Sequence, residues 1–332
     1  MSRAIKSGVA EEALAVYARW WQLETWLRQL VNIELRALYG ASWDAQLKSV
    51  AVARSKREMG AAYAASPDAS NPIAFIDVTD LLDLISDHWD IFAPSLSPSK
   101  TAWSGRMEEL RDLRHRIAHC RQPHSDDLRR VEQLLRDLES GTKRSIAAYN
   151  DPDVPEDRWN DPLVDAWWHG RHKTARRLLG HAEAKYETRF QLRYSVRPWF
   201  KGPVVDHISG LPGAVWEAQW TTSMTVMPDE LWHYDYLDKY RHLIMNLLMP
   251  SPNFVRVTFA AIDDPLLIAD AIGRIFDSIL HVGERFTAPS LSDEWNEGWR
   301  GRGRYLELRA QVGTWLATYE PHLASRVTIF GA

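Results

Sequence analysis

The chain has 332 residues, of which 45% are hydrophobic and 25% charged, and it carries a formal net charge of -4 at pH 7. This length predicts about two domains, each with a core of its own. The slightly negative charge excludes a broad basic surface that would coat nucleic acid, so any phosphate binding must be local. A single cysteine, Cys120, excludes an internal disulfide framework and a cysteine-based zinc cluster.

No stretch of the sequence approaches the roughly 18 consecutive apolar residues of a membrane span. The N-terminal residues contain no continuous apolar segment of the kind found in secretory signals. We therefore expect a cytoplasmic protein that makes no contact with a membrane.

Apolar residues recur at helical spacing through the first 140 residues, which predicts an all-α helical bundle. The expected helices cover residues 11–38, 43–59, 73–92, 104–121 and a last segment from Ser125 or Asp126 to residue 138. Gly40, a loop at residues 66–72, Pro94, Pro98 and Pro123 are the expected interruptions. Thr79 or Asp80 is the expected N-cap of the third helix.

Residues 150–162 are acidic and rich in proline and turn-forming pairs, and they predict a linker. We therefore expect a helical domain over residues 1–149 and a second domain over residues 163–332. Alternating apolar residues beyond the linker predict strands, so the second domain is expected to be α+β. The expected helices are residues 166–187, 229–248 and 265–280, and the expected strands are residues 190–196, 215–226, 254–259 and 327–330.

The segment at residues 110–121 concentrates positive charge and imidazoles on one predicted helix. It contains four arginines, a single acid (Asp112), and the pair His115 and His119 one helical turn apart. Arg114 and His119 lie about 140° apart around an ideal helix, so their side chains do not point in parallel. They converge only if the arginine curls back, if the helix is distorted, or if a second copy of the chain completes the pocket.

Imidazole is the natural proton carrier at neutral pH, and guanidinium is the natural clamp for a phosphate. RNA supplies its own nucleophile, the 2′-hydroxyl, so these two groups suffice for its cleavage without a metal. One alternative is that the histidines and arginines only solvate the helix. A second is a metal ion shared by His115 and His119 with a carboxylate such as Asp112, and a third is a nucleophilic Cys120.

An arginine, a polar residue, three further residues and a histidine form a pattern that resembles the motif of the HEPN superfamily, whose members are commonly metal-independent endoribonucleases. Arg114, His115 and His119 fit this pattern. Residues 23–43 and 75–92 also resemble the branch found in a nuclear transcript-surveillance endoribonuclease and in bacterial toxin and defence proteins. The resemblance covers roughly residues 10–140.

The resemblance implies that His119 transfers protons, that Arg114 contacts the phosphate and that His115 orients its neighbours. It implies cleavage of RNA, with tRNA as one candidate substrate, by 2′-hydroxyl attack to a 2′,3′-cyclic phosphate, with no cofactor and no metal. It also implies a homodimer in which two motifs meet, acting as a toxin or abortive-infection antiviral effector under an antitoxin or trigger protein. The alternative is a catalytically inactive HEPN scaffold that binds nucleotide, RNA or an antitoxin partner.

Five further residues are secondary candidates around the motif. Arg111 is expected to bind substrate and orient the site, and Arg116 and Arg121 either follow the RNA backbone or only solvate the helix. Glu24 and Arg28, one turn apart on the first helix, either support the motif or form an exposed ion pair.

The second domain is rich in aromatic residues, with ten of the 16 tryptophans after residue 150. Tryptophan fills cores and also stacks on bases and ligands, and we favour the core interpretation. A basic patch at residues 169–177 either contacts RNA or a partner, or forms a solvated helix face. Residues 229–242 form either a ligand pocket or an amphipathic helix. We expect this domain to recognise the target or the trigger.

Overall fold

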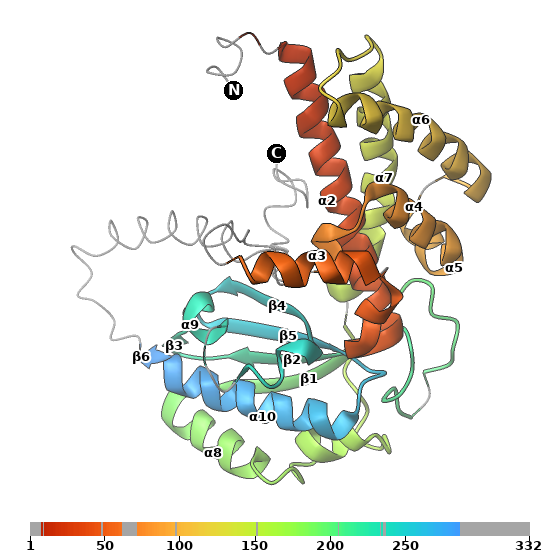
Figure 1. The fold of residues 1–332 in the computed structure, drawn as a ribbon. Helices are drawn as coiled ribbons and strands as arrows, with labels where there is room; N and C mark the ends of the chain where they lie inside the picture. Colours follow the sequence, from red (N-terminus) through yellow and green to blue (C-terminus); the bar gives the residue numbers. More distant parts are fainter. Residues whose placement is uncertain are drawn as a thin grey trace.

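The computed structural model describes residue 8 and residues 10–285, except residues 48, 62–71, 97, 151, 205, 233 and 235–236. A helical bundle is followed by a four-stranded antiparallel sheet with its own helices (Figure 1). The predicted fold class, an all-α part followed by an α+β part, is therefore confirmed. No described helix combines the length and the apolar character that crossing a bilayer requires.

The bundle contains helices close to those predicted. Its α-helices are α2 (Glu11–Tyr39), α3 (Ser49–Met59), α4 (Val78–Asp87), α5 (Trp89–Phe92), α6 (Lys100–Ala118) and α7 (Asp127–Asn150). The 3-10 helices η1 (Gly40–Gln46), η2 (Pro72–Phe75) and η3 (Ala93–Ser95) connect them. Gly40 ends α2 as predicted, and its positive φ of 61° is a conformation that glycine adopts without steric cost.

Several helices of the bundle differ from the prediction. The helix expected over residues 43–59 is divided into η1 and α3. The single helix expected over residues 73–92 is broken at His88, whose ring bonds both to the Leu84 carbonyl and to the Tyr39 hydroxyl. Its cap position is Asp77 rather than Thr79 or Asp80. In contrast, α7 continues well beyond residue 138. At Gly141 it passes so close to the Ser95 carbonyl that any side chain would clash.

The sheet has the strand order β1-β2-β5-β4, and all neighbouring strands are antiparallel. Its strands are β1 (Arg189–Val196), β2 (Ala214–Thr221), β4 (Ile244–Ser251) and β5 (Phe254–Ala260), while β3 (Met224–Thr225) pairs with β6 (Glu284–Arg285). Helices α8 (Ala175–Tyr186) and α10 (Pro265–Val282) cover one face of the sheet, and the bundle stands on the other side (Figure 1). Trp167, Phe190, Trp220 and Phe276 pack together beneath α10, as the core interpretation of tryptophan predicts.

The helix expected over residues 229–248 is wrong. The chain there forms α9 (Pro228–Trp232), the 3-10 turn η6 (Arg241–Leu243) and then β4. Pairing with β5 and burial of Leu247 and Leu248 outweigh the helical spacing of the local sequence. Residues 229–242 therefore do not form one amphipathic helix.

Other predicted elements of the second half are changed in part. The helix expected over residues 166–187 is divided into a π-helical turn, η4 (Val164–Trp168), and α8. The strand expected over residues 215–226 is divided into β2 and β3. Strand β5 and helix α10 lie where they were predicted, and the strand expected at residues 327–330 lies outside the described residues.

Two separate hydrophobic cores correspond to the two parts of the fold. One is formed by bundle residues between Val16 and Leu138, and the other by residues between Trp159 and Ile279. The segment between them, expected to be a linker, packs against the sheet: Asp153 pairs with Tyr194, and Asp161 is fully buried. The division into residues 1–149 and 163–332 stays a prediction.

Helix α2 connects the two cores through buried polar contacts near its C-terminus. The side chains of Glu34 and Arg197 are 0% and 1% exposed, and two N–H groups of Arg197 donate to the carboxylate at 2.6 and 3.0 Å. The Trp199 indole donates a third hydrogen bond to Glu34 at 2.7 Å. Two residues further along, Arg36 donates to the His242 carbonyl at 2.7 Å. The bundle is thus fixed to the sheet by the helix that runs through its own core.

Candidate functional site

Helix α6 carries the predicted motif at its C-terminal end. The Ser99 hydroxyl caps its first turn by accepting the Ala102 N–H. Its buried face consists of Trp103, Met107, Leu110 and Leu113, which pack into the bundle core. This packing leaves the histidines on the outer side of the helix.

The end of α6 places His119 at the last, C-capping position. Cys120 follows with a φ of 50°, and its N–H bonds to the Ile117 carbonyl while the Arg121 N–H bonds to the Arg116 carbonyl. These two bonds form a Schellman motif, in which glycine usually occupies the position of Cys120. The helix therefore stops one residue before His119, earlier than the predicted end at residue 121.

The two histidines of the motif lie against each other on the surface. The ring centroids of His115 and His119 are 4.4 Å apart, and the rings meet edge to face. Both residues are exposed in the single chain. Two imidazoles in contact can accept and donate protons on the same ligand. Both rings are accessible to a ligand from solvent.

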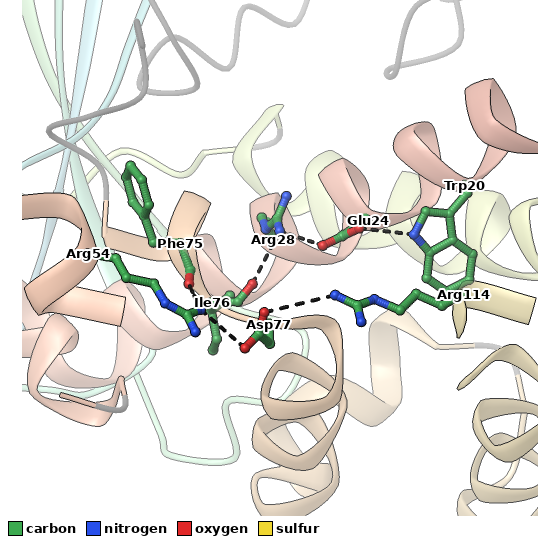
Figure 2. Close-up of polar contacts among 8 residues, drawn as sticks. All are labelled: Trp20, Glu24, Arg28, Arg54, Phe75, Ile76, Asp77 and Arg114. Carbon is green, nitrogen blue, oxygen red and sulfur yellow. Dashed lines mark hydrogen bonds and ion pairs between the residues drawn. The ribbon is translucent and has the colours of Figure 1, made fainter. Parts of the chain in front are cut away.

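The Arg114 side chain extends toward Asp77, at the beginning of α4 (Figure 2). Its Nη2 atom lies 3.9 Å from Asp77 Oδ1, and Nη1 of Arg54 from α3 donates to Asp77 Oδ2 at 3.1 Å. Arg54 also donates to the Phe75 carbonyl. Asp77 thus lies between two guanidinium groups that come from different helices.

Glu24 and Arg28 of α2 lie beside this cluster (Figure 2). Arg28 donates to Glu24 and to the Ile76 carbonyl, the residue before Asp77. The Trp20 indole donates to the second Glu24 oxygen at 3.0 Å. The two side chains are partly buried, 18% exposed for Glu24 and 24% for Arg28, so they do not form a purely solvent-exposed pair.

The three remaining arginines of the motif have different environments. Arg111 pairs with Asp83 at 2.9 Å on the surface, and Arg121 is exposed and forms no ion pair with a described residue. Arg116 instead binds the buried Asp127 with two N–H groups. This pairing fixes the start of α7 to the end of α6, so Arg116 is engaged in the fold.

The Asp127 carboxylate is held ionised by its surroundings. Burial alone raises its pKa, but the hydrogen bonds from Arg116 and from the His124 N–H, together with the Arg116 charge, outweigh burial and lower the pKa below the usual value. The same pairing raises the pKa of Arg116. Two of the five guanidinium N–H groups of Arg116 are thereby engaged by Asp127, which leaves fewer of them for a substrate phosphate.

A groove of about 540 Å³ between α6 and α7 is a second arginine-rich surface. Arg106, Arg129, Arg130 and Arg136 contribute to its lining. Asp137, Asp126 and Glu109 pair with the first three of them. These acids cancel most of the positive charge of the groove.

The basic patch expected at residues 169–177 is also neutralised by acids. Arg171 pairs with Asp165, and both His172 and Lys173 contact Asp270. Residues 169–174 form a turn between η4 and α8, and only residues 175–177 of the patch lie in α8, so the patch is not a single helix face. Within the described residues, no group of three or more histidine, cysteine and carboxylate side chains could hold a metal ion.

The helical bundle carries the Arg-His motif at the end of α6, as the resemblance to HEPN domains implies. Residues 21–140 match the family described as Swt1-like HEPN. The predicted resemblance is thus confirmed for this part of the chain. No curated protein and no solved structure matches the chain.

Sequence reasoning missed Arg54 and Asp77. Each comes from a helix other than α6, and neither stands in a recognisable motif. The only sequence signal was the position of Asp77 before a helical apolar pattern, where acidic residues are common as caps.

Proposed function

We propose that the protein is a metal-independent endoribonuclease that cleaves RNA by attack of the 2′-hydroxyl, leaving a 2′,3′-cyclic phosphate and a 5′-hydroxyl. The observation that carries the proposal is the exposed pair of imidazoles, His115 and His119, on the helix that presents Arg114, within a Swt1-like HEPN domain. Swt1 itself is an endoribonuclease. In this proposal His119 is the general acid or base, Arg114 stabilises charge on the phosphate, and His115 with Arg111 orients and binds the substrate.

The proposed enzyme is a homodimer, because Arg114 and His119 of one chain are about 140° apart around an ideal helix. A two-fold axis beside the end of α6 repeats the same surface on both subunits. It brings the partner's His119 toward Arg114 across a shared groove. The exposure of both histidines in the single chain supports this arrangement.

We further propose that the activity serves a toxin or antiviral defence effector. The α+β part then recognises the trigger or an antitoxin, and the buried contacts of Glu34 give it a fixed connection to the HEPN domain. An inactive scaffold that binds nucleotide, RNA or an antitoxin is the second candidate. It is favoured by the absence, among the described residues, of any hydrogen bond that orients the His115 or His119 ring.

Incubation of the purified protein with tRNA and total RNA in EDTA tests the proposal. We expect cleavage that persists in EDTA and falls by about 10²- to 10⁴-fold in His119→Ala, the usual contribution of a general acid or base. Cleavage by Arg114→Ala should fall similarly. The control variant His207→Ala, at an exposed position remote in the sequence, should cleave RNA as the parent protein does. Loss of cleavage on chelation would favour a metal, and unchanged cleavage by His119→Ala would reject the site.

The two candidate functions predict different effects when the protein is expressed in a cell. An active ribonuclease should arrest growth on expression, and the arrest should disappear with Arg114→Ala or His119→Ala. A scaffold should be harmless in all three forms. The mass of the protein in solution tests the dimer separately.

A further inference from the structure

Three guanidinium groups from three helices converge at the start of α4. Arg28 from α2 donates to the Ile76 carbonyl, and Arg54 from α3 donates to the Asp77 carboxylate (Figure 2). Arg114 from α6 approaches the same carboxylate at 3.9 Å. Two carboxylates, Asp77 and Glu24, lie among them, so the cluster keeps a net positive charge. In a chain with a net charge of -4, this is a local concentration of cations.

Asp77 occupies this cluster as a weakly held counter-ion. Its side chain is 50% exposed, and those of Arg54 and Arg114 are each 40% exposed. Exposed ion pairs of this kind contribute little to stability, and the Arg114 contact at 3.9 Å is too long for a hydrogen bond. A phosphate, which accepts paired N–H donors from arginine, can therefore replace the carboxylate without a large loss.

An exposed aromatic pair continues the same surface along α2. Tyr17 and Trp21 are 57% and 61% exposed, although large aromatic side chains are usually buried. With Glu24 and Arg28 they fall within about 60° of the helix circumference, at successive spacings of four, three and four residues. The stripe thus leads from two exposed rings to the arginine that contacts the Asp77 turn.

The geometry points to a binding site for single-stranded RNA in which a backbone phosphate takes the place of Asp77 between Arg54 and Arg114, and neighbouring bases stack on Trp21 and Tyr17. Cationic grooves lined with aromatic rings bind single strands in this way, with little dependence on sequence. The choice of RNA as ligand rests on the proposed function. Arg54, Trp21 and Tyr17 thereby become substrate-binding residues outside the Arg-His motif.

Binding of a fluorescent, fully 2′-O-methylated RNA oligonucleotide to the full chain tests the phosphate part of the site, because this probe cannot be cut by 2′-hydroxyl attack. We expect Arg54→Gln to weaken binding and to reduce the slope of log affinity against log salt by about 0.7, the value for one lost phosphate contact on a single strand. Arg54→Lys should restore the slope. Arg57→Gln, one turn along in the same helix and in no ion pair with a described residue, is the matched control and should bind as the parent does.

The counter-ion and the aromatic pair have their own variants. Asp77→Asn should tighten binding several-fold, whereas Asp87→Asn, at an exposed position in α4, should not. Trp21→Ala should weaken binding about tenfold without changing the salt slope, since base stacking carries no charge. The exposed Trp168→Ala, in the other part of the chain, is its control.

Three results would overturn the inference: no binding by the parent protein, a salt slope unchanged in Arg54→Gln, or an affinity unchanged in Trp21→Ala. If Trp21→Ala keeps its affinity and turns a dimer into a monomer, the aromatic pair is a subunit contact and not a base platform. Failure of the proposed function is distinct, because it appears as absence of cleavage of ordinary RNA while the binding series keeps its pattern.

Discussion

Replacement of Arg197 by methionine isolates a buried carboxylate between the two cores. In the native structure Glu34 is fully buried and accepts two hydrogen bonds from Arg197 and one from Trp199. Arg197→Met removes two of these bonds and the neutralising charge. Breaking a buried ion pair by removing one partner costs about 3–5 kcal/mol, a large share of the roughly 5–15 kcal/mol that stabilises a folded protein.

Urea denaturation followed by fluorescence measures this cost. The double variant Glu34→Leu with Arg197→Met should lose no more than about half as much free energy of unfolding as the single variant, because it removes both charges of the pair together. Arg158→Met breaks an ion pair whose side chains are 82% and 58% exposed, and it should cost less than about 1 kcal/mol. If Arg197→Met lowers the free energy of unfolding no more than Arg158→Met does, the assignment of the Glu34–Arg197 pair as the main polar connection between the two cores is refuted.

Three further predictions concern single residues. Burial raises the pKa of Glu217 to about 7 against the opposing charges of Arg256 and Arg193. The protonated carboxyl therefore contributes its full share to the free energy of unfolding below pH 4.5, and this contribution is lost as the pH rises to about 7. The loss should reach about 3 kcal/mol in urea titrations at successive pH values, and it should vanish in Glu217→Gln but not in the exposed Glu183→Gln. Arg116→Gln should lower the free energy of unfolding by about 1–3 kcal/mol, because it leaves Asp127 buried, while the salt slope of RNA binding stays that of the parent; a reduced slope would return Arg116 to the substrate site. Cys120→Gly should raise the free energy of unfolding by about 1 kcal/mol, because glycine adopts the positive φ without strain, and Cys120→Val should lower it; equal melting temperatures would contradict this.

Elements with long, regular patterns were predictable from the sequence. The pattern of α2 persists over 29 residues, and α10 combines an Asp264 cap with an apolar stripe. In contrast, residues 229–248 carry helical spacing over a segment whose second half is a strand. The pairing of β4 with β5 decides its structure, and that partner is invisible to a local pattern.

The candidate site likewise contains residues that were predictable from the local sequence and residues that were not. Arg114, His115 and His119 could be predicted because they lie on one helix within six residues. Arg54 and Asp77 are brought to Arg114 only by the packing of three helices. The RNA contact proposed for Arg116 did not anticipate Asp127, because the local sequence gives no sign that this carboxylate is buried.

Helix α2 is a continuous rod of about 43 Å that is held at one end and displays its aromatic stripe toward the other. The angle between the stripe and the Glu34 anchor is therefore set by the number of residues between them. One alanine inserted between Arg28 and Glu34 would turn Tyr17 and Trp21 by about 100° relative to the sheet without removing a single side chain. The Glu34 contacts and the packing of α2 in the bundle core must therefore agree on one rotation of this helix, so the number of residues between Arg28 and Glu34 is constrained.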